Sequence, residues 1–161
     1  MELEPPTEFY EHLGRVVVAG SALEAHTAEA AYFASGAAPG DIGDAWRSAA
    51  RPTGALGELT RQAARLPEGD LRSELERLHA DARALLDRRN KVVHSIIVLD
   101  MPDEVGGESV WLHFHPRTGA EEPLPISELR ELTTRLNAVS ARAVMLSGRA
   151  ADYWRTRESA R

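Results

Sequence analysis

Apolar residues recur every three or four positions along three long stretches of this chain, and that spacing permits few folds. The first series runs from Phe9 to Ala30, the second from Leu71 to Ile96 and the third from Leu129 to Tyr153. Steps of three and four residues place side chains on one face of an α-helix. Because each apolar face must be buried against another, the sequence predicts three long helices packed as a bundle.

Shorter elements are expected between and after these helices. Pro52 divides the segment behind the first helix into two short helices, at about 44–50 and 54–66. Two β-branched and aromatic runs flank a segment rich in Pro and Gly, and they predict an appended β-hairpin at about 96–115. The segment 117–125 is expected to be a loop. The predicted fold class is therefore mainly all-α, with a single domain over 1–161.

Length and composition fit one compact domain and exclude several kinds of site. The chain has 161 residues and no cysteine, so thiol catalysis, cysteine-bound zinc and disulfides are ruled out. The first ten residues are acidic, and no apolar run approaches the roughly 18 residues of a membrane span. We therefore expect a cytoplasmic protein with no membrane partner.

The charge of the chain restricts any contact with nucleic acid to a local patch. The formal net charge is −6, which opposes attraction of the whole surface to a polyanion. Residues 83–91 nevertheless hold Arg83, Arg88, Arg89 and Lys91 against one acid, Asp87. This segment is the candidate for a local phosphate contact.

Arg89 breaks the pattern of the series in which it lies, since its neighbours on that face are Leu85 and Val92. Arginine keeps its proton, so a partly buried one needs a carboxylate, a phosphate or an open cleft. Glu24 on the first helix is a candidate carboxylate. His94 follows five residues later, which on a continuous helix is about 140° around the axis, a gap that a long arginine can close in one groove. Asn90 and His94, four apart, share a face.

This trio suits cleavage of RNA without a metal. In that reaction the ribose 2′-hydroxyl attacks the adjacent phosphate, one group takes its proton, and another protonates the departing 5′-oxygen. Histidine performs either proton transfer near neutral pH, arginine stabilises the charged phosphorane, and asparagine orients one of them.

The segment Arg89-Asn90-Lys91-Val92-Val93-His94 resembles the R-x4-6-H motif of HEPN domains. Those are helical-bundle proteins, many of them metal-independent endoribonucleases of toxin–antitoxin, defence and RNA-processing systems. The resemblance implies that Arg89 and His94 are the catalytic pair, that Asn90 supports them, and that two copies line a shared cleft. Ser95 strengthens the likeness. The tyrosine that some members carry two positions after the histidine is replaced here by Ile96.

Simpler interpretations exist for each of these residues. Arg83, Asp87, Asn90 and His94 also fit the wet face of an amphipathic helix, and Glu24 fits an ordinary exposed glutamate. His113 and His115 lie two apart on a predicted strand with Trp111. Three interpretations are open for this pair. The two histidines could begin a metal site, although no third ligand is clear, or they could simply form a polar strand face. They could also belong to a rim on which Trp111 stacks an RNA base.

Three hypotheses follow for the function. The first is a homodimeric HEPN-like endoribonuclease, with RNA as substrate, no cofactor or metal, Lys91, Arg88 and Arg83 on flanking phosphates, Glu24 and Ser95 in support, and an antitoxin or regulatory protein as a possible partner. The second is a non-catalytic HEPN-like module that binds nucleotide or RNA, or dimerises. The third is a scaffold in which Arg89 and Glu24 form a structural ion pair, so that Arg89→Ala destabilises the fold by a few kcal/mol. The first hypothesis requires Arg89 and His94 to share their surroundings.

Overall fold

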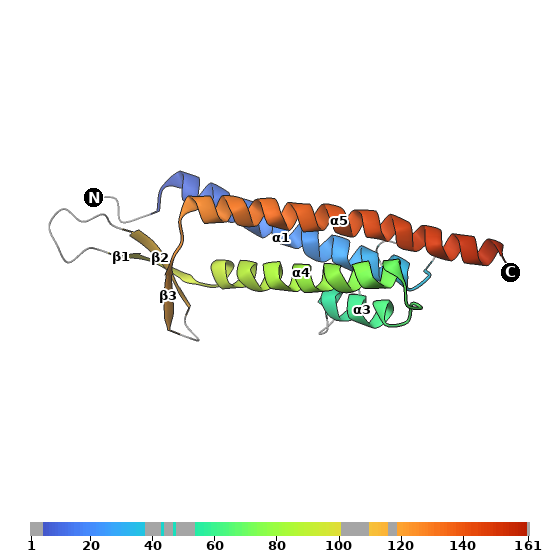
Figure 1. Cartoon of the computed structure of the whole chain (residues 1–161). Helices are drawn as coiled ribbons and strands as arrows, with labels where there is room; N and C mark the ends of the chain where they lie inside the picture. Colours follow the sequence, from blue (N-terminus) through green and yellow to red (C-terminus); the bar gives the residue numbers. More distant parts are fainter. Residues whose placement is uncertain are drawn as a thin grey trace.

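The chain folds into a long bundle of helices with a small β-sheet at one end, as a computed structural model shows (Figure 1). The structure describes residues 5–37, 43, 47, 54–100, 110–115 and 119–160. Three long helices lie side by side: α1 (Thr7–Ala34), α4 (Asp70–Val93) and α5 (Ile126–Ser159). The prediction of three long helices is therefore confirmed.

One short helix, α3 (Gly54–Ala63), packs below the half of the bundle that is distant from the sheet (Figure 1). It agrees with the predicted helix at 54–66, although it ends three residues earlier. The other predicted short helix, at about 44–50, lies outside the described residues except for Arg47.

The interior of the bundle is built from the apolar faces that the spacing predicted. Leucine and alanine dominate it, and the largest side chains with almost no exposure include Phe9, Leu23, Leu78 and Leu136. One group of buried residues joins the sheet-side halves of α1, α4 and α5, and a second joins the distal halves to α3. Burial of this kind contributes about 1.5–3 kcal/mol for each large apolar side chain. None of the described helices is long and apolar enough to cross a membrane.

The β-structure is larger than predicted. Strand β1 (Ile96–Asp100) pairs antiparallel with β2 (Val110–His115), which confirms the hairpin. A third strand, β3 (Ala120–Pro123), pairs antiparallel with β2 in the segment expected to be a loop. That expectation was wrong because Ala120-Glu121-Glu122-Pro123 has low β-propensity, and the unpaired edge of β2 supplies the hydrogen bonds that sequence periodicity does not reveal.

Helix α4 ends earlier than its apolar spacing predicts. The spacing extends α4 to Ile96, whereas the helix ends at Val93 and His94 is its C-terminal cap, with φ −100° and ψ 9°. Ile96 belongs instead to β1, where it pairs with Phe114. The β-branched residues at this point continue the helical spacing only by coincidence. Their backbone N–H and C=O groups form hydrogen bonds in the sheet instead of in the helix.

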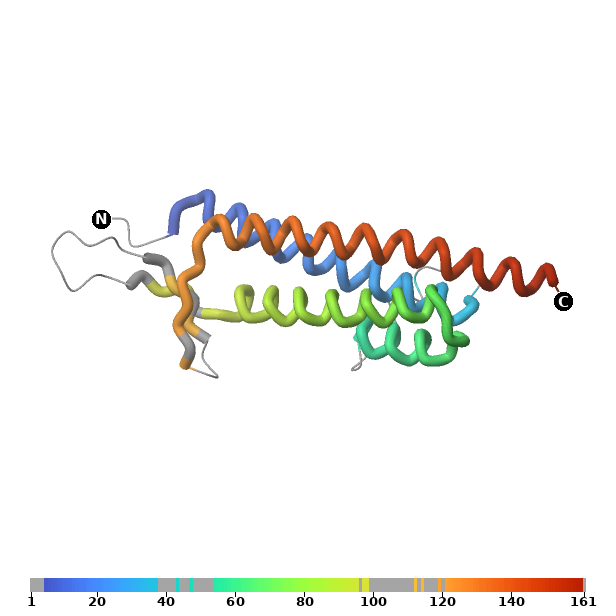
Figure 2. Tube along the Cα trace, in the orientation of Figure 1, coloured from blue at the N-terminus to red at the C-terminus, as the bar shows by residue number. Residues whose placement is uncertain are grey.

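The trace in Figure 2 shows that α5 continues beyond the other helices at the end away from the sheet. Near that end the indole Nε1 of Trp154 donates a hydrogen bond to the carbonyl oxygen of Ala34, the last residue of α1, at 3.1 Å. Gly36 follows with a positive φ of 81°, and a Cβ built on it would stand 3.2 Å from the Trp154 ring. The end of α1 is thus closed by a residue of α5.

Gly36→Ala should therefore destabilise the protein by about 1–2 kcal/mol, because an L side chain disfavours this φ and would also press on Trp154. Gly148→Ala is the matched control, since no atom stands within 4 Å of its Cβ position in the middle of α5. That change should stabilise by about 0.5–1 kcal/mol. Urea unfolding of both variants measures the difference, and equal effects would contradict this account.

Candidate functional site

The guanidinium of Arg89 lies between α4 and α1 and contacts Glu24. Its Nη2 donates a hydrogen bond to Oε1 of Glu24 at 2.6 Å. The arginine side chain is only 13% exposed, and its Nε is buried with no hydrogen-bond partner among the described residues. The interpretation that Arg89 faces inward and needs an anion is therefore correct, and the anion in the free chain is the carboxylate proposed for it.

Gly20 on α1 makes this arrangement sterically possible. A Cβ built at Gly20 would stand 2.6 Å from Nε of Arg89 and 3.1 Å from its Cγ. The aliphatic stem of Arg89 thus lies directly on the α1 backbone, where only glycine leaves room. Gly20 belongs to the predicted apolar face of α1, but its role as the seat of Arg89 was missed. The sequence does contain a signal for this role: a glycine inside a long helix costs about 1 kcal/mol relative to alanine, so its presence indicates that something packs closely against the backbone there.

The carboxylate of Glu24 remains accessible to solvent. Its side chain is 47% exposed. Water therefore screens the ion pair, and we assign it no more than about 1 kcal/mol of stability. The scaffold hypothesis expected a loss of a few kcal/mol from an uncompensated buried acid, and that mechanism does not apply because the acid is half exposed.

Asn90 and His94 are exposed in the last turn of α4 and at its cap. The backbone N–H of His94 donates to the carbonyl of Asn90 at 3.0 Å, which continues the helical hydrogen-bond pattern to the cap. The structure does not bring Arg89 and His94 into shared surroundings. Arg89 faces α1 and binds a glutamate, whereas His94 faces solvent, so the free chain does not meet the requirement of the nuclease hypothesis.

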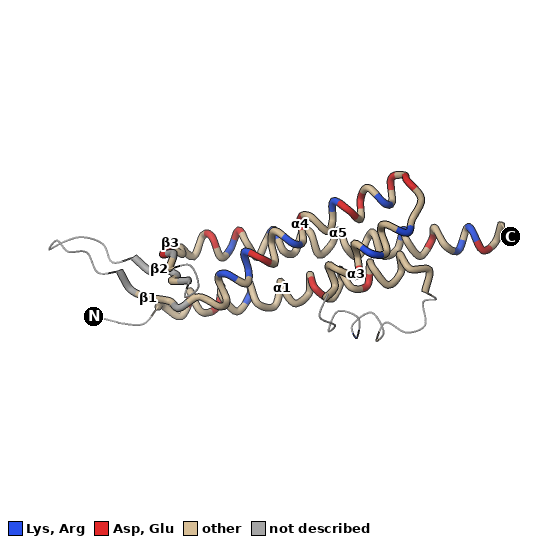
Figure 3. The backbone as a smooth tube through the Cα atoms, turned by 90° about the horizontal axis from the view of Figure 1, so that it is seen from below, with Lys and Arg blue, Asp and Glu red and all other residues tan. Residues whose placement is uncertain are grey.

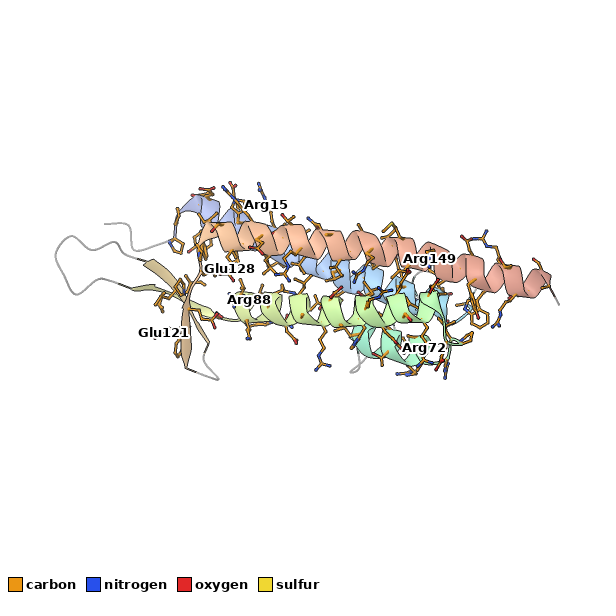
Figure 4. The ribbon with its side chains drawn as sticks, viewed as in Figure 1. Arg15, Arg72, Arg88, Glu121, Glu128 and Arg149 are labelled. Atoms are coloured by element: carbon orange, nitrogen blue, oxygen red, sulfur yellow. The ribbon has the colours of Figure 1, made fainter. Side chains whose placement is uncertain are left out.

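Arg88 is held by two carboxylates rather than left open for phosphate. Its Nε donates to Oε1 of Glu128 on α5 at 3.0 Å, and its Nη1 donates to Oε2 of Glu122 on β3 at 3.0 Å. Figure 4 shows Arg88 and Glu128 turned toward one another between α4 and α5. Burial disfavours the charge of Arg88, but the hydrogen bonds to Glu128 and Glu122 outweigh it and raise the pKa of this guanidinium. Arg88 therefore fastens the sheet to the bundle.

The other residues assigned to RNA lie on the surface around the end of α4. Arg83 is 68% exposed, and its Nε lies 4.0 Å from Oδ2 of Asp87, as expected for the solvent-exposed face of an amphipathic helix. Lys91 is exposed and forms no ion pair with a described residue. The hydroxyl of Ser95 donates to the carbonyl of Lys91, so Ser95 closes the last turn of the helix. Of the predicted phosphate-binding cations, Arg83 and Arg88 thus each have a carboxylate partner, and Lys91 has none among the described residues.

His113 and His115 lie on β2 with Trp111, and their side chains are outside the described residues. In the described part of the chain, no group of three His, Asp or Glu side chains is placed to hold a metal ion.

Comparison with protein-family models, with curated proteins and with solved structures gives no match for this chain.

The contact between Gly20 and Arg89 can be tested by a double-mutant cycle. Gly20→Ala adds helix propensity but displaces the arginine stem, so the gain of about 1 kcal/mol should be cancelled or reversed in the wild-type background. In an Arg89→Ala background the same change should stabilise the protein, because the obstructing stem is gone.

Free energies of unfolding in urea give the coupling, which we expect to be about 1 kcal/mol or more. Gly14→Ala is the control, since its Cβ position has no atom within 4 Å and should show no dependence on Arg89. Additive effects of Gly20→Ala and Arg89→Ala would show that the two residues are not in contact.

Proposed function

We propose that this protein is a HEPN-type endoribonuclease that works as a homodimer and cleaves RNA without a metal. The observation that supports it is the placement of Arg89. This guanidinium lies against Gly20 between α4 and α1 and is paired with a single, half-exposed carboxylate that an incoming phosphate can replace. The exposed turn with Asn90 and His94 follows on the same helix.

The chemistry assigns one role to each group. The RNA 2′-hydroxyl attacks the adjacent phosphorus while the bond to the 5′-oxygen breaks, so the products are a 2′,3′-cyclic phosphate and a 5′-hydroxyl. His94 transfers a proton as general base or general acid, and Asn90 positions it. Arg89 stabilises the phosphorane through its planar fork of N–H donors. Lys91 and Arg83 bind flanking phosphates. Arg88 binds a further phosphate when it is released from Glu122 and Glu128.

Glu24 has to be displaced before Arg89 can bind a phosphate. A carboxylate and a phosphate oxygen compete for the same N–H donors, and because Glu24 is 47% exposed its ion pair with Arg89 contributes about 1 kcal/mol or less. Glu24 therefore holds the guanidinium in one orientation in the free chain. His94 is exposed at the end of the helix, so its side chain can turn toward a bound RNA more easily than Glu24 can be displaced.

The direct test is cleavage of single-stranded RNA by purified protein in EDTA. We expect cleavage that yields 2′,3′-cyclic ends, and we expect His94→Ala and Arg89→Lys each to lower the rate by about 10²-fold or more. His79→Ala is the matched control, because His79 lies on the same helix away from the motif and should leave the rate unchanged. Cleavage unaffected by His94→Ala would remove His94 from the mechanism.

A second candidate is a non-catalytic HEPN-like module that binds nucleotide or RNA, or dimerises. It is favoured by one observation: Arg88 and Arg89 are engaged by three carboxylates, Glu24, Glu122 and Glu128, which lowers the local positive charge. Filter binding of RNA in EDTA separates the two candidates. Binding that depends on Lys91 without any cleavage would support the module and overturn the nuclease.

Measurements of the free energy of unfolding distinguish a catalytic role of Arg89 from a purely structural one. Arg89→Met keeps an unbranched stem on Gly20 and removes the charge, so it should change the free energy of unfolding by less than about 1 kcal/mol. Arg89→Ala also removes the stem and should cost about 1–2 kcal/mol more. Both variants should lose cleavage alike, whereas a scaffold role predicts that Arg89→Met is as unstable as Arg89→Ala.

A further inference from the structure

A cavity of about 340 Å³ lies between α4 and α5, in the half of the bundle that is distant from the sheet. One of its residues, Arg77, is about 18 Å along α4 from Arg89, so the cavity is separate from the candidate site. Three arginines and one glutamate line it, which makes its walls positive in a chain whose net charge is −6. The lining residues are Glu74 and Arg77 of α4, and Arg142, Met145, Leu146 and Arg149 of α5.

Ion pairs between the two helices lie at both ends of the cavity. At one end Arg149 of α5 pairs with Glu74 of α4. At the other end Nη2 of Arg142 donates to Oδ2 of Asp81 at 2.6 Å. The two pairs are seven residues apart on each helix, or about 10 Å. Figure 3 shows the acidic and basic positions interleaved along α4. The pairs hold the helices together and leave the space between them open.

Arg77 lies between these pairs and has no carboxylate partner in the part of the chain that the structure describes. The hydrogen bond from its Nε goes to the backbone carbonyl of Ser73, at 3.3 Å. Arg142 approaches Arg77 as well, since its Nη2 lies 3.5 Å from the carbonyl oxygen of Arg77. The α5 residues at this level are Met145 and Leu146, neither of which is anionic. The middle of the cavity thus has cations and lacks an anion.

The surface between these cations is apolar. Leu146 is 3% exposed and forms the floor, whereas Met145 is 64% exposed and lies at the mouth. The methylene stems of the arginines add to this apolar surface. Methionine is flexible and adapts its shape to an apolar neighbour. An apolar molecule in the cavity would therefore rest on Leu146 and be covered by Met145.

The polar groups of the walls select the chemistry of the ligand. Arginine has five N–H donors and no acceptor. The one carboxylate that lines the cavity, Glu74, is already bound to Arg149. A sugar or a nucleobase would bring donors that find no free acceptor here, whereas an ionised carboxylate brings acceptors alone. The walls therefore favour a ligand whose polar end is an anion and whose remainder is apolar.

The size of the cavity restricts the ligand further. Pockets that bind small molecules measure roughly 300–1,000 Å³, and this one lies near the lower limit. A short apolar chain enters such a space, whereas a peptide helix about 10 Å across does not.

We propose that this cavity binds a small aliphatic carboxylate, whose head group pairs with Arg77 and whose chain lies between Leu146 and Met145. The carboxylate supplies the anion that the middle of the seam lacks, and the chain covers apolar surface that is open in the free protein. The apolar contact supplies affinity, and the guanidinium fixes the orientation of the ligand. This inference is independent of the proposed nuclease activity, because it involves no residue of the Arg89 site.

Isothermal titration calorimetry with octanoate tests the ligand class. Octanoate should bind to one site per chain. Octanol has the same chain without the charge, and acetate has the charge without the chain, so each should bind at least fivefold more weakly. Octanol that binds as tightly as octanoate would overturn the role of the cation. Absence of octanoate binding at millimolar concentration would overturn the proposal.

Removal of one charge tests the assignment of Arg77. Arg77→Met keeps an unbranched stem, so it should raise the Kd of octanoate at least fivefold and leave the Kd of octanol unchanged. Arg155→Met is the matched control, since Arg155 is 70% exposed on α5 outside the cavity and should change neither value. Arg77 is exposed, so the variant should keep the fold, which circular dichroism checks. An unchanged octanoate affinity in Arg77→Met would reject the site.

The methionine in the mouth of the cavity reports the place of binding without any substitution. The chain has three methionines, Met1, Met101 and Met145. In protein labelled with ¹³C at the methionine methyl groups, octanoate should shift the NMR signal of Met145 in a saturable manner and leave the other two in place. Met145→Leu assigns the signal. Saturable binding that leaves the Met145 signal unmoved would show that octanoate binds elsewhere and would overturn the proposal.

Discussion

The contact between α1 and α4 is built around a cation. Arg89 lies in the apolar face of α4, and its stem rests on the backbone of α1 at Gly20. Its charge is balanced by Glu24, one turn further along α1. These three residues fix how closely α1 and α4 approach, because any side chain at position 20 would meet the arginine. The two helices are thus fitted to the cation, and the cation is held in one place between them.

The β-sheet determines where the exposed end of the motif lies. Helix α4 stops at Val93 and β1 begins at Ile96, so His94 lies at the junction of the bundle and the sheet. Arg88 binds Glu122 on β3 and Glu128 on α5, which ties the sheet to both helices at this junction. The last turn of α4 is therefore supported from both sides while its outer face stays open.

Much of this structure follows from the spacing of apolar residues, and the rest does not for identifiable reasons. The three long helices and the inward direction of Arg89 are predictable because burial dictates them, and Glu24 could be named because it lies on the facing side of α1. The end of α4 was misplaced because Val92, Val93 and Ile96 suit a helix face and a strand equally well. The two partners of Arg88 lie 34 and 40 positions further along the chain, and no local pattern encodes such contacts. Strand β3 forms on the free edge of β2, which the spacing of apolar residues does not reveal.

Glu24 explains how an arginine can lie in the apolar face of α4. An arginine buried without an anion would cost several kcal/mol, so a chain that keeps one there has to supply the anion itself. Glu24 is that anion, and its 47% exposure keeps the pair weak enough to open to another anion. His94 is separate from this pair, because α4 ends at Val93 and His94 is exposed. The burial of Arg89 and the exposure of His94 therefore have different causes: the first follows from the contact between α1 and α4, and the second from the change from helix to strand.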